Sequence, residues 1–284
     1  MSFLIVSGLS GSGKSIALHA LEDHGFYCID NLPARLLPQL AKEAIQSTDA
    51  TFKKIAVGMD VRNKTFLNEL GSCLQELKDI GLEYHIIYLE TEEPILVKRY
   101  NETRRKHPLT DDSISLLEGI ALEKKLLDPL SRQSSLRIDT THTTPQQLRQ
   151  QVIDFCVAEK EGGSTLLFKS FGYKHGTPLD ADFVFDIRCL PNPYWQQELR
   201  KYSGLDQPVI AFLKQQSEVS TMLEDIIGFI QKWLPAFGRE QRAYITVAVG
   251  CTGGQHRSVY VAERLAAHFS ESGIRTLVRH RDLS

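Results

Sequence analysis

A glycine-rich loop near the beginning of the chain has the residue types and the spacing of a phosphate-binding loop. It follows the pattern Gly-x-x-x-x-Gly-Lys-Ser, and its residues are Gly8, Leu9, Ser10, Gly11, Ser12, Gly13, Lys14 and Ser15. Glycines allow backbone N–H groups to converge on phosphate oxygens, and the helix that follows presents its positive end. Lys14 would neutralise the β- and γ-phosphates, while Ser15 would offer its hydroxyl to Mg²⁺. The loop therefore predicts binding of a purine nucleoside triphosphate, either ATP or GTP.

An acidic residue at the end of a neighbouring strand usually completes the magnesium site beside such a loop. Asp60, which follows an apolar strand-like run, is the candidate for this acid, and Glu90 is the alternative. The nearby Arg62 could meet the nucleotide or an acceptor molecule. The predicted nucleotide site therefore also includes Asp60, Val61, Arg62 and Asn63.

A basic cluster in the same half of the chain leaves an enzymatic alternative open. P-loop kinases that act on small molecules close an arginine-bearing lid over the phosphates, and the segment from Arg99 to Arg105 has a comparable position. A solvated helix end would have the same composition. The alternative is therefore a small-molecule kinase that uses Lys14, Asp60 and this lid. Its acceptor would bind near Asp30-Asn31.

A second candidate anion loop lies near the end of the chain, between a strand-like run and a helix-like run. Its residues are Cys251, Thr252, Gly253, Gly254, Gln255, His256, Arg257 and Ser258. Glycine-rich backbone at a helix N-terminus again predicts phosphate binding. The spacing Cys-x₅-Arg-Ser also matches cysteine-dependent phosphatases, in which the cysteine is the nucleophile and the arginine clasps the phosphoryl group. We identify no general acid for that chemistry, so phosphate binding is the prediction and a phosphatase is the alternative.

Alternating strand and helix signals surround both loops. Strand-like runs in the first half are expected at residues 3–7, 26–29, 54–60, 84–89 and 136–139. Helical patterns are expected between them, at residues 14–24, 65–80, 94–100 and 114–127, and again after Pro145. In the second half the clearest unit is a strand, the second loop, a helix and a further strand over residues 243–278. This alternation is typical of an α/β fold with parallel sheets flanked by helices.

The length of 284 residues predicts two domains, since one domain commonly contains about 100 to 200 residues. Hydrophobic residues make up 42% of the chain and charged residues 24%, which excludes global disorder. The polar, glycine-containing run at residues 158–164 is the best candidate for a boundary. We therefore predict a P-loop, kinase-like domain at residues 1–160 and a second α/β domain with the strand-loop-helix anion cradle at residues 165–284.

The net charge of -2 means that affinity for nucleic acid would have to come from a local basic patch. The final stretch offers one, which could bind RNA phosphates or be a solvated terminus, and consists of Arg275, Arg279, His280 and Arg281. No run of residues approaches the roughly 18 apolar residues that span a bilayer. The five cysteines form no Cys-x-x-Cys pair that would indicate a zinc site. We therefore expect a cytoplasmic protein with no membrane partner.

Several longer blocks, together with both loops, resemble the RapZ family of RNase adapter proteins, also called the YvcJ-type P-loop nucleotide-binding family. The resemblance covers almost the whole chain. In the first half it rests on the P-loop, on Gly25-Phe26-Tyr27-Cys28-Ile29-Asp30-Asn31-Leu32-Pro33 and on residues 60–63. In the second half it rests on residues 170–176, 180–186, 190–193 and 251–258.

The resemblance implies a kinase-like N-terminal domain that binds ATP or GTP, and a C-terminal domain that binds RNA and senses glucosamine-6-phosphate. Members of the family act as adapters. They present a small regulatory RNA to RNase E, and the resulting cleavage lowers production of glucosamine-6-phosphate synthase. The implied protein is a homo-oligomeric regulator rather than primarily an enzyme.

The resemblance also assigns the sugar phosphate to the second loop, with Tyr194 beside it. Two positions depart from the family pattern, because Gln255 stands where a lysine is often found and Tyr194 where a histidine occurs. Some members end in a lysine- and arginine-rich tail, whereas this sequence ends in residues 279–284, Arg-His-Arg-Asp-Leu-Ser. The contacts to the sugar and to RNA are therefore expected to differ from those of other members.

Overall fold

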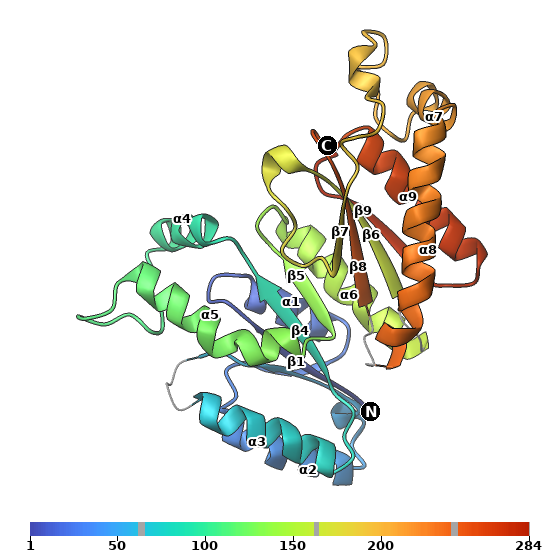
Figure 1. The fold of residues 1–284 in the computed structure, drawn as a ribbon. Helices are drawn as coiled ribbons and strands as arrows, with labels where there is room; N and C mark the ends of the chain where they lie inside the picture. The colour runs from blue at the N-terminus through green and yellow to red at the C-terminus, as the bar shows by residue number, and fades with distance from the viewer. Residues whose placement is uncertain (62–65, 162–164, 240–243, 284) are drawn as a thin grey trace. The chain divides into compact units, whose positions relative to one another are not determined.

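The computed structural model of the protein describes residues 1–61, 66–161, 165–239 and 244–283. These residues form two compact units, Met1–Val157 and Ala158–Ser284, and each unit contains its own parallel sheet (Figure 1). The α/β fold class predicted from the sequence is therefore confirmed.

The first unit is built on a five-stranded parallel sheet with the strand order β2-β3-β1-β4-β5. Its strands are β1 (Ser2–Gly8), β2 (Tyr27–Ile29), β3 (Lys54–Gly58), β4 (His85–Glu90) and β5 (Leu136–Asp139). The central strand β1 pairs in parallel with β3 on one side and with β4 on the other. The carboxyl ends of the strands therefore meet at one edge of the sheet, which is where ligands bind in open α/β sheets.

Helices cover both faces of this sheet. They are α1 (Lys14–Asp23), α2 (Leu37–Gln46), α3 (Phe66–Asp79), α4 (Glu93–Thr103), α5 (Leu116–Arg132) and α6 (Pro145–Glu161). Residues of α2, α3 and α5 share one hydrophobic cluster with alternate residues of β1, β3 and β4. Helix α1 contacts β1, β2 and β3 from the opposite side of the sheet (Figure 1).

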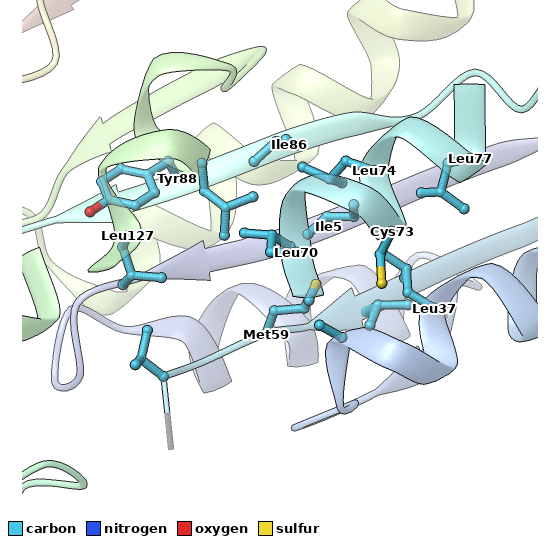
Figure 2. Close-up of a cluster of buried hydrophobic side chains, with 14 of the residues drawn as sticks. Ile5, Leu37, Met59, Leu70, Cys73, Leu74, Leu77, Ile86, Tyr88 and Leu127 are labelled. Atoms are coloured by element: carbon cyan, nitrogen blue, oxygen red, sulfur yellow. The ribbon is translucent and has the colours of Figure 1, made fainter. Parts of the chain in front are cut away.

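Apolar spacing on α3 explains how this helix packs. Leu70, Leu74 and Leu77 recur at intervals of three and four, so they share one face of the helix. Figure 2 shows this face beside Ile5 of β1 and Ile86 of β4. All five side chains are at most 3% exposed, so the core lies directly beneath β1, the strand that leads into the P-loop.

Two local features differ from the sequence prediction. Helix α2 lies in a segment for which the sequence analysis predicts no helix; the structure places Pro38 in its first turn, where the missing N–H of proline costs no hydrogen bond. Helix α6 continues through Glu161, so part of the run at residues 158–164 is helical instead of a linker. Helix α5 begins at a capping box formed by Ser115 and Glu118, a signal that the sequence does contain.

The second unit has a four-stranded parallel sheet with the strand order β7-β8-β6-β9. Its strands are β6 (Thr165–Gly172), β7 (Phe183–Asp186), β8 (Tyr244–Cys251) and β9 (Thr276–His280). Its helices are α7 (Gln207–Lys214), α8 (Ser217–Arg239) and α9 (Arg257–Glu271). All three helices contribute to one hydrophobic cluster with alternate residues of β6 and β8. The loop between β8 and α9 therefore lies at the carboxyl edge of this sheet.

Within the described ranges, no helix is both long enough and apolar enough to cross a membrane.

Replacing Leu127 by Ala should lower the free energy of unfolding of the first unit by about 2 to 5 kcal/mol, because it leaves a cavity in the core. Leu127 is fully buried, whereas Leu117 on the same helix is 53% exposed. Leu117→Ala is therefore the matched control and should change the free energy by no more than about 0.5 kcal/mol. Denaturant unfolding followed by circular dichroism measures both, and equal losses would contradict the packing of α5.

Candidate anion-binding sites

The loop between β1 and α1 has the backbone shape of a phosphate cradle. Gly11 and Gly13 have φ angles of +89° and +107°, a region that residues with a side chain rarely adopt. Helix α1 has neither a side-chain cap nor an acidic residue in its first turn, so its positive end is not compensated. The sequence prediction of a strand, a glycine-rich loop and a helix in this order is confirmed.

Hydrogen-bond donors of this loop are available to a ligand. The N–H groups of Gly11 and Gly13 donate no hydrogen bond within the part of the chain that the structure describes. Lys14 Nζ donates to the carbonyl oxygen of Gly8 at 2.7 Å, which places the ammonium beside the loop. Amide donors at a helix N-terminus together with an ammonium group fit a phosphate.

Arg99 and Thr140 bind carbonyl oxygens of the loop. Arg99 on α4 donates to the carbonyl oxygen of Gly11 at 2.9 Å and to that of Thr140 at 2.7 Å. The Thr140 hydroxyl donates to the carbonyl oxygen of Ser12 at 2.9 Å. Burial lowers the pKa of Arg99, and the negative charge of Asp139 offsets this effect only in part. Arg99, for which the sequence analysis leaves a lid and a solvated helix end as alternatives, therefore braces the P-loop.

Glu123 on α5 also binds the loop, and the sequence analysis did not identify it. Its carboxylate accepts the N–H of Ser10 at 2.8 Å, the hydroxyl of Ser10 at 2.6 Å and Nε2 of His107 at 3.1 Å. Burial raises the pKa of Glu123, but the hydrogen bond from His107, the charge of Lys14 and the bonds from Ser10 outweigh it and leave the pKa below its usual value. A buried carboxylate therefore lies directly behind the phosphate cradle.

The remaining residues of the predicted nucleotide site differ in their surroundings. Asp60 follows β3 at the carboxyl edge of the sheet and is partly exposed. The side chains of Leu9 and Val61 belong to the hydrophobic core, so any ligand contact from them would involve the backbone. Arg62 and Asn63 lie outside the described residues.

Ser15 and Asp60 are the residues that fit a magnesium ion. Ser15 is exposed in the first turn of α1. The alternative acid, Glu90, is 7% exposed and accepts two hydrogen bonds from Arg137, at 2.6 and 3.1 Å. The described residues contain no group of three or more His, Cys, Asp and Glu side chains that could bind a metal ion. Mg²⁺ at this site would therefore depend on phosphate oxygens of the nucleotide, as is usual for this ion.

The loop between β8 and α9 is a second cradle at the carboxyl edge of the other sheet. Gly254 has a φ of +74°, and a Cβ atom at this position would lie 2.6 Å from the backbone nitrogen of Gly172. Over the described residues, the N–H groups of Gly253 and Gln255 donate no hydrogen bond. Helix α9, like α1, begins without a side-chain cap or an acidic first turn. This loop therefore has the same donor character as the P-loop.

Arg257 fixes one wall of the second cradle. Its Nη1 donates to the carbonyl oxygens of Arg188 and Leu190, at 2.7 and 2.9 Å, and Nη2 lies 3.4 Å from the hydroxyl of Thr252. Its Nε is buried and has no hydrogen-bond partner in the described part of the chain. The guanidinium therefore connects the loop after β7 to the cradle, and its Nε–H has no acceptor among the described residues.

The surroundings of Cys251 differ from those that a phosphatase nucleophile requires. Its side chain is 3% exposed and lies 3.1 Å from the hydroxyl of Ser258, while its sulfur accepts the N–H of Gly254 at 3.2 Å. A reactive cysteine lies in a partly exposed, electropositive site. Cys251 and Ser258 therefore form the base of the cradle.

His256 and Tyr194 lie at the side of the second cradle. Their ring centroids are 6.5 Å apart, and Tyr194 is 49% exposed. Burial lowers the pKa of His256, and the charge of Arg257 lowers it further. Hydrogen bonds to the backbone of Leu199 and Tyr202 act in the opposite direction but do not outweigh these effects. The imidazole is therefore neutral at pH 7 and can act as a hydrogen-bond donor or acceptor.

The predicted RNA-binding residues are not arranged as a solvated basic end. Arg281 donates to the carbonyl oxygens of Gly172 and Gly176, at 3.0 and 2.8 Å, and its side chain is 11% exposed. His280 is bonded through both ring nitrogens, to Ser170 and Glu263. Arg281 therefore fixes the end of β6, where the backbone nitrogen of Gly172 lies beside Gly254 of the second cradle.

Arg275 and Arg279 are the other two predicted residues of this end, and both are partly exposed. Arg275 directly precedes the edge strand β9, and Arg279 lies within it. The carbonyl oxygen of Arg275 accepts the N–H of Leu166.

A parallel sheet whose central strand passes through a Gly-x-x-x-x-Gly-Lys-Ser loop into a helix defines a P-loop protein. Two family models match this chain, described as RapZ-like N-terminal domain over residues 1–160 and RapZ C-terminal domain over residues 164–284. The chain therefore belongs to the RapZ family, in agreement with the motifs that resemble it.

Relatives and solved structures show further similarity. A nucleotide-binding protein of Pseudomonas putida (strain GB-1) is 50% identical over the full length of both chains. One of Methylobacillus flagellatus is 53% identical over 100% of this chain and 99% of its own. A sugar kinase of Janibacter sp. HTCC2649 has a TM-score of 0.38 and 17% identity, and covers 54% of this chain and 93% of its own. A shikimate kinase of Bacteroides thetaiotaomicron has a TM-score of 0.38 and 10% identity, and covers 56% and 98%.

Replacing Arg99 by Ala should destabilise the first unit by about 1.5 to 3 kcal/mol, because it removes charged hydrogen bonds and leaves carbonyl oxygens of the loop unpaired. Lys98→Ala is the matched control, since this neighbouring side chain is 71% exposed and only approaches Glu102 at 3.9 Å. The control should change stability by less than about 1 kcal/mol. Thermal and denaturant unfolding measure both variants, and an unchanged Arg99→Ala protein would contradict the bracing role.

Proposed function

We propose that the protein is an RNA-binding adapter with a nucleotide site in its first unit and a sugar-phosphate site in its second. ATP or GTP, together with Mg²⁺, binds the P-loop. Glucosamine-6-phosphate binds the second cradle. A small regulatory RNA is presented to RNase E, which controls the production of glucosamine-6-phosphate synthase.

The observation that carries the proposal is the presence of two glycine-rich cradles, one at the carboxyl edge of each sheet. Each cradle has amide donors without a partner in the described chain and a helix N-terminus that lacks an acidic first turn. Such sites suit phosphate groups. The names of the relatives, which are nucleotide-binding proteins, support the assignment of a nucleotide to this chain.

Residues of the first cradle have distinct roles in nucleotide binding. The N–H groups of Gly11 and Gly13 would donate to phosphate oxygens, and Lys14 would neutralise their charge. Ser15 and Asp60 would hold Mg²⁺, whose chemistry is to screen the phosphate charges. Since Arg99 binds the loop itself, these groups explain binding without a requirement for turnover, and the small-molecule kinase stays an alternative.

Residues of the second cradle suit a phosphorylated amino sugar. The N–H groups of Gly253 and Gln255, with the unused Nε of Arg257, would donate to the phosphate. The neutral His256 and the exposed Tyr194 offer polar and aromatic contacts to the sugar ring. Because Arg257 also connects the cradle to the loop after β7, an occupied cradle can influence the surface around it. The proposal includes a homo-oligomer that binds RNA through this second unit.

Lys14→Ala should weaken ATP binding by about 10- to 100-fold, because it removes a charged donor to the phosphates. Calorimetric titration of the full-length variant with ATP and GTP in the presence of Mg²⁺ measures this loss. Lys78→Ala is the matched control, since Lys78 is an exposed lysine of the same unit on α3. An affinity equal to that of the parent would contradict the nucleotide site.

Glucosamine-6-phosphate should release a small regulatory RNA from the full-length protein in a gel-retardation assay at physiological salt. Arg257→Ala should abolish this release, while Arg264→Ala, an exposed arginine of the same helix, should preserve it. Inorganic phosphate serves as the control for a general anion effect. The adapter proposal fails if no structured RNA is retarded, and the sensor proposal fails if the sugar phosphate leaves the complex unchanged.

A further inference from the structure

We propose that Glu123 and His107 form a buried pair that positions the P-loop for nucleotide binding. The inference rests on the proposed nucleotide site and adds two positioning residues that none of the loop motifs contains. Neither residue would touch the nucleotide; both act through Ser10.

The carboxylate of Glu123 binds the loop through both of its oxygens. Oε2 accepts the N–H of Ser10 at 2.8 Å, and Oε1 accepts the Ser10 hydroxyl at 2.6 Å. This two-point contact fixes the backbone of Ser10 immediately before Gly11, whose N–H faces no partner in the described chain. The glutamate is fully buried and 113 residues away in sequence, so the contact is a tertiary restraint on the shape of the loop.

His107 completes the carboxylate's surroundings in one defined protonation state. Its Nδ1 accepts the N–H of Leu109 at 3.2 Å, so the ring proton lies on Nε2, which donates to Glu123 at 3.1 Å. The ring fits against α5 because residue 119 is glycine, where a Cβ atom would lie 3.1 Å from Nδ1. His107 therefore donates from Nε2 to Glu123 while its Nδ1 is occupied by Leu109.

Tyr100 provides a second contact between this pair and the cradle. Its ring lies 5.3 Å from that of His107, and a Cβ atom at Gly11 would be 3.6 Å from its Cε2 atom. Burial and the charge of Glu123 raise the pKa of Tyr100 to about 12, so the ring stays uncharged. The side of the P-loop that carries Ser10 and Gly11 is thus supported by α4, by the segment after it and by α5.

A carboxylate satisfies all three donors at once. The Ser10 N–H, the Ser10 hydroxyl and the His107 N–H converge on it, and a carboxylate has two accepting oxygens and no proton to donate. Glutamine at position 123 would direct its NH₂ group toward at least one of these groups; if this is the Ser10 hydroxyl, the hydroxyl has to accept instead of donate, and its own buried proton loses the acceptor that it has on Glu123. Because a buried donor without an acceptor is unfavourable, the loop would have to move.

Charge and position predict opposite effects, which makes the inference testable. A negative charge behind an anion site disfavours phosphate, so removal of the charge alone would tighten nucleotide binding. Loss of the loop's position would weaken it instead. The sign of the change therefore separates a positioning role from a purely electrostatic one.

The test uses calorimetric titration of full-length variants with ATP and Mg²⁺, combined with hydrogen exchange. Glu123→Gln should bind ATP about tenfold more weakly and show faster amide exchange in residues 9–13. Asp128→Asn, an exposed acid of the same helix, is the matched control and should behave like the parent. A merely structural role would instead raise exchange throughout α5 and lower the melting temperature without a local change in the loop.

The histidine variants test the pair even if the Glu123→Gln protein does not fold. His107→Leu removes the donor and should weaken ATP binding, while His107→Gln retains an N–H near the position of Nε2 and should bind nearly as well as the parent. The double variant Glu123→Gln/His107→Leu should bind no more weakly than Glu123→Gln alone, because residues that act as a unit are not additive.

The outcomes distinguish this inference from the proposed function. Equal or tighter ATP binding by Glu123→Gln, with His107→Leu and His107→Gln indistinguishable, would overturn the positioning role while the nucleotide site stands. If the parent binds neither ATP nor GTP, the proposed function fails. The exchange of residues 9–13 then decides the structural claim, which fails if Glu123→Gln leaves it unchanged.

Discussion

A loop between a strand and a helix can present its N–H groups to a ligand only if its backbone is held in one shape. Its carbonyl oxygens then need hydrogen-bond partners of their own. Both units meet this constraint with hydrogen-bond donors that bind carbonyl oxygens of the loop. In the first unit these donors are the side chains of Lys14, Arg99 and Thr140. In the second unit they are backbone N–H groups: that of Lys174 binds the carbonyl oxygen of Thr252 at 3.2 Å, and that of Gly204 binds the carbonyl oxygen of Gln255 at 2.8 Å. The shape of each cradle therefore depends on residues outside its glycine-rich motif.

The two units use partners from different parts of the chain. The second cradle is braced by residues at the ends of neighbouring strands, including Asp282, which accepts the N–H of Gly172 at 2.6 Å. The first cradle is braced by Arg99, Thr140 and Glu123, which lie far from it in sequence. Each cradle thus has a carboxylate that binds an adjacent backbone amide. In the first unit the same contacts therefore hold α4 and α5 in place and fix the shape of the nucleotide site.

Much of the fold could be predicted because both loops lie between buried strands and amphipathic helices, whose periodicity is visible in the sequence. The bracing residues could not be predicted, since the pairing of Ser10 with Glu123 spans 113 positions and leaves no local pattern. One signal was present: Glu123 lies three residues after Ile120 and four before Leu127, so it falls on the buried face of α5. The final arginine and histidine, read as a basic end, are bonded within the fold because β9 brings them against β6.

Lys14 shows how one group can support the loop and still bind a ligand. An ammonium group has three N–H donors, and the carbonyl oxygen of Gly8 accounts for one of them. A bond to one acceptor therefore does not prevent an ammonium group from also binding a phosphate. The hydrogen bond from His107, the charge of Lys14 and the bonds from Ser10 lower the pKa of Glu123, so its carboxylate is ionised at neutral pH. These contacts order the loop from within the fold, so the free energy of ordering it would not have to come from a bound phosphate.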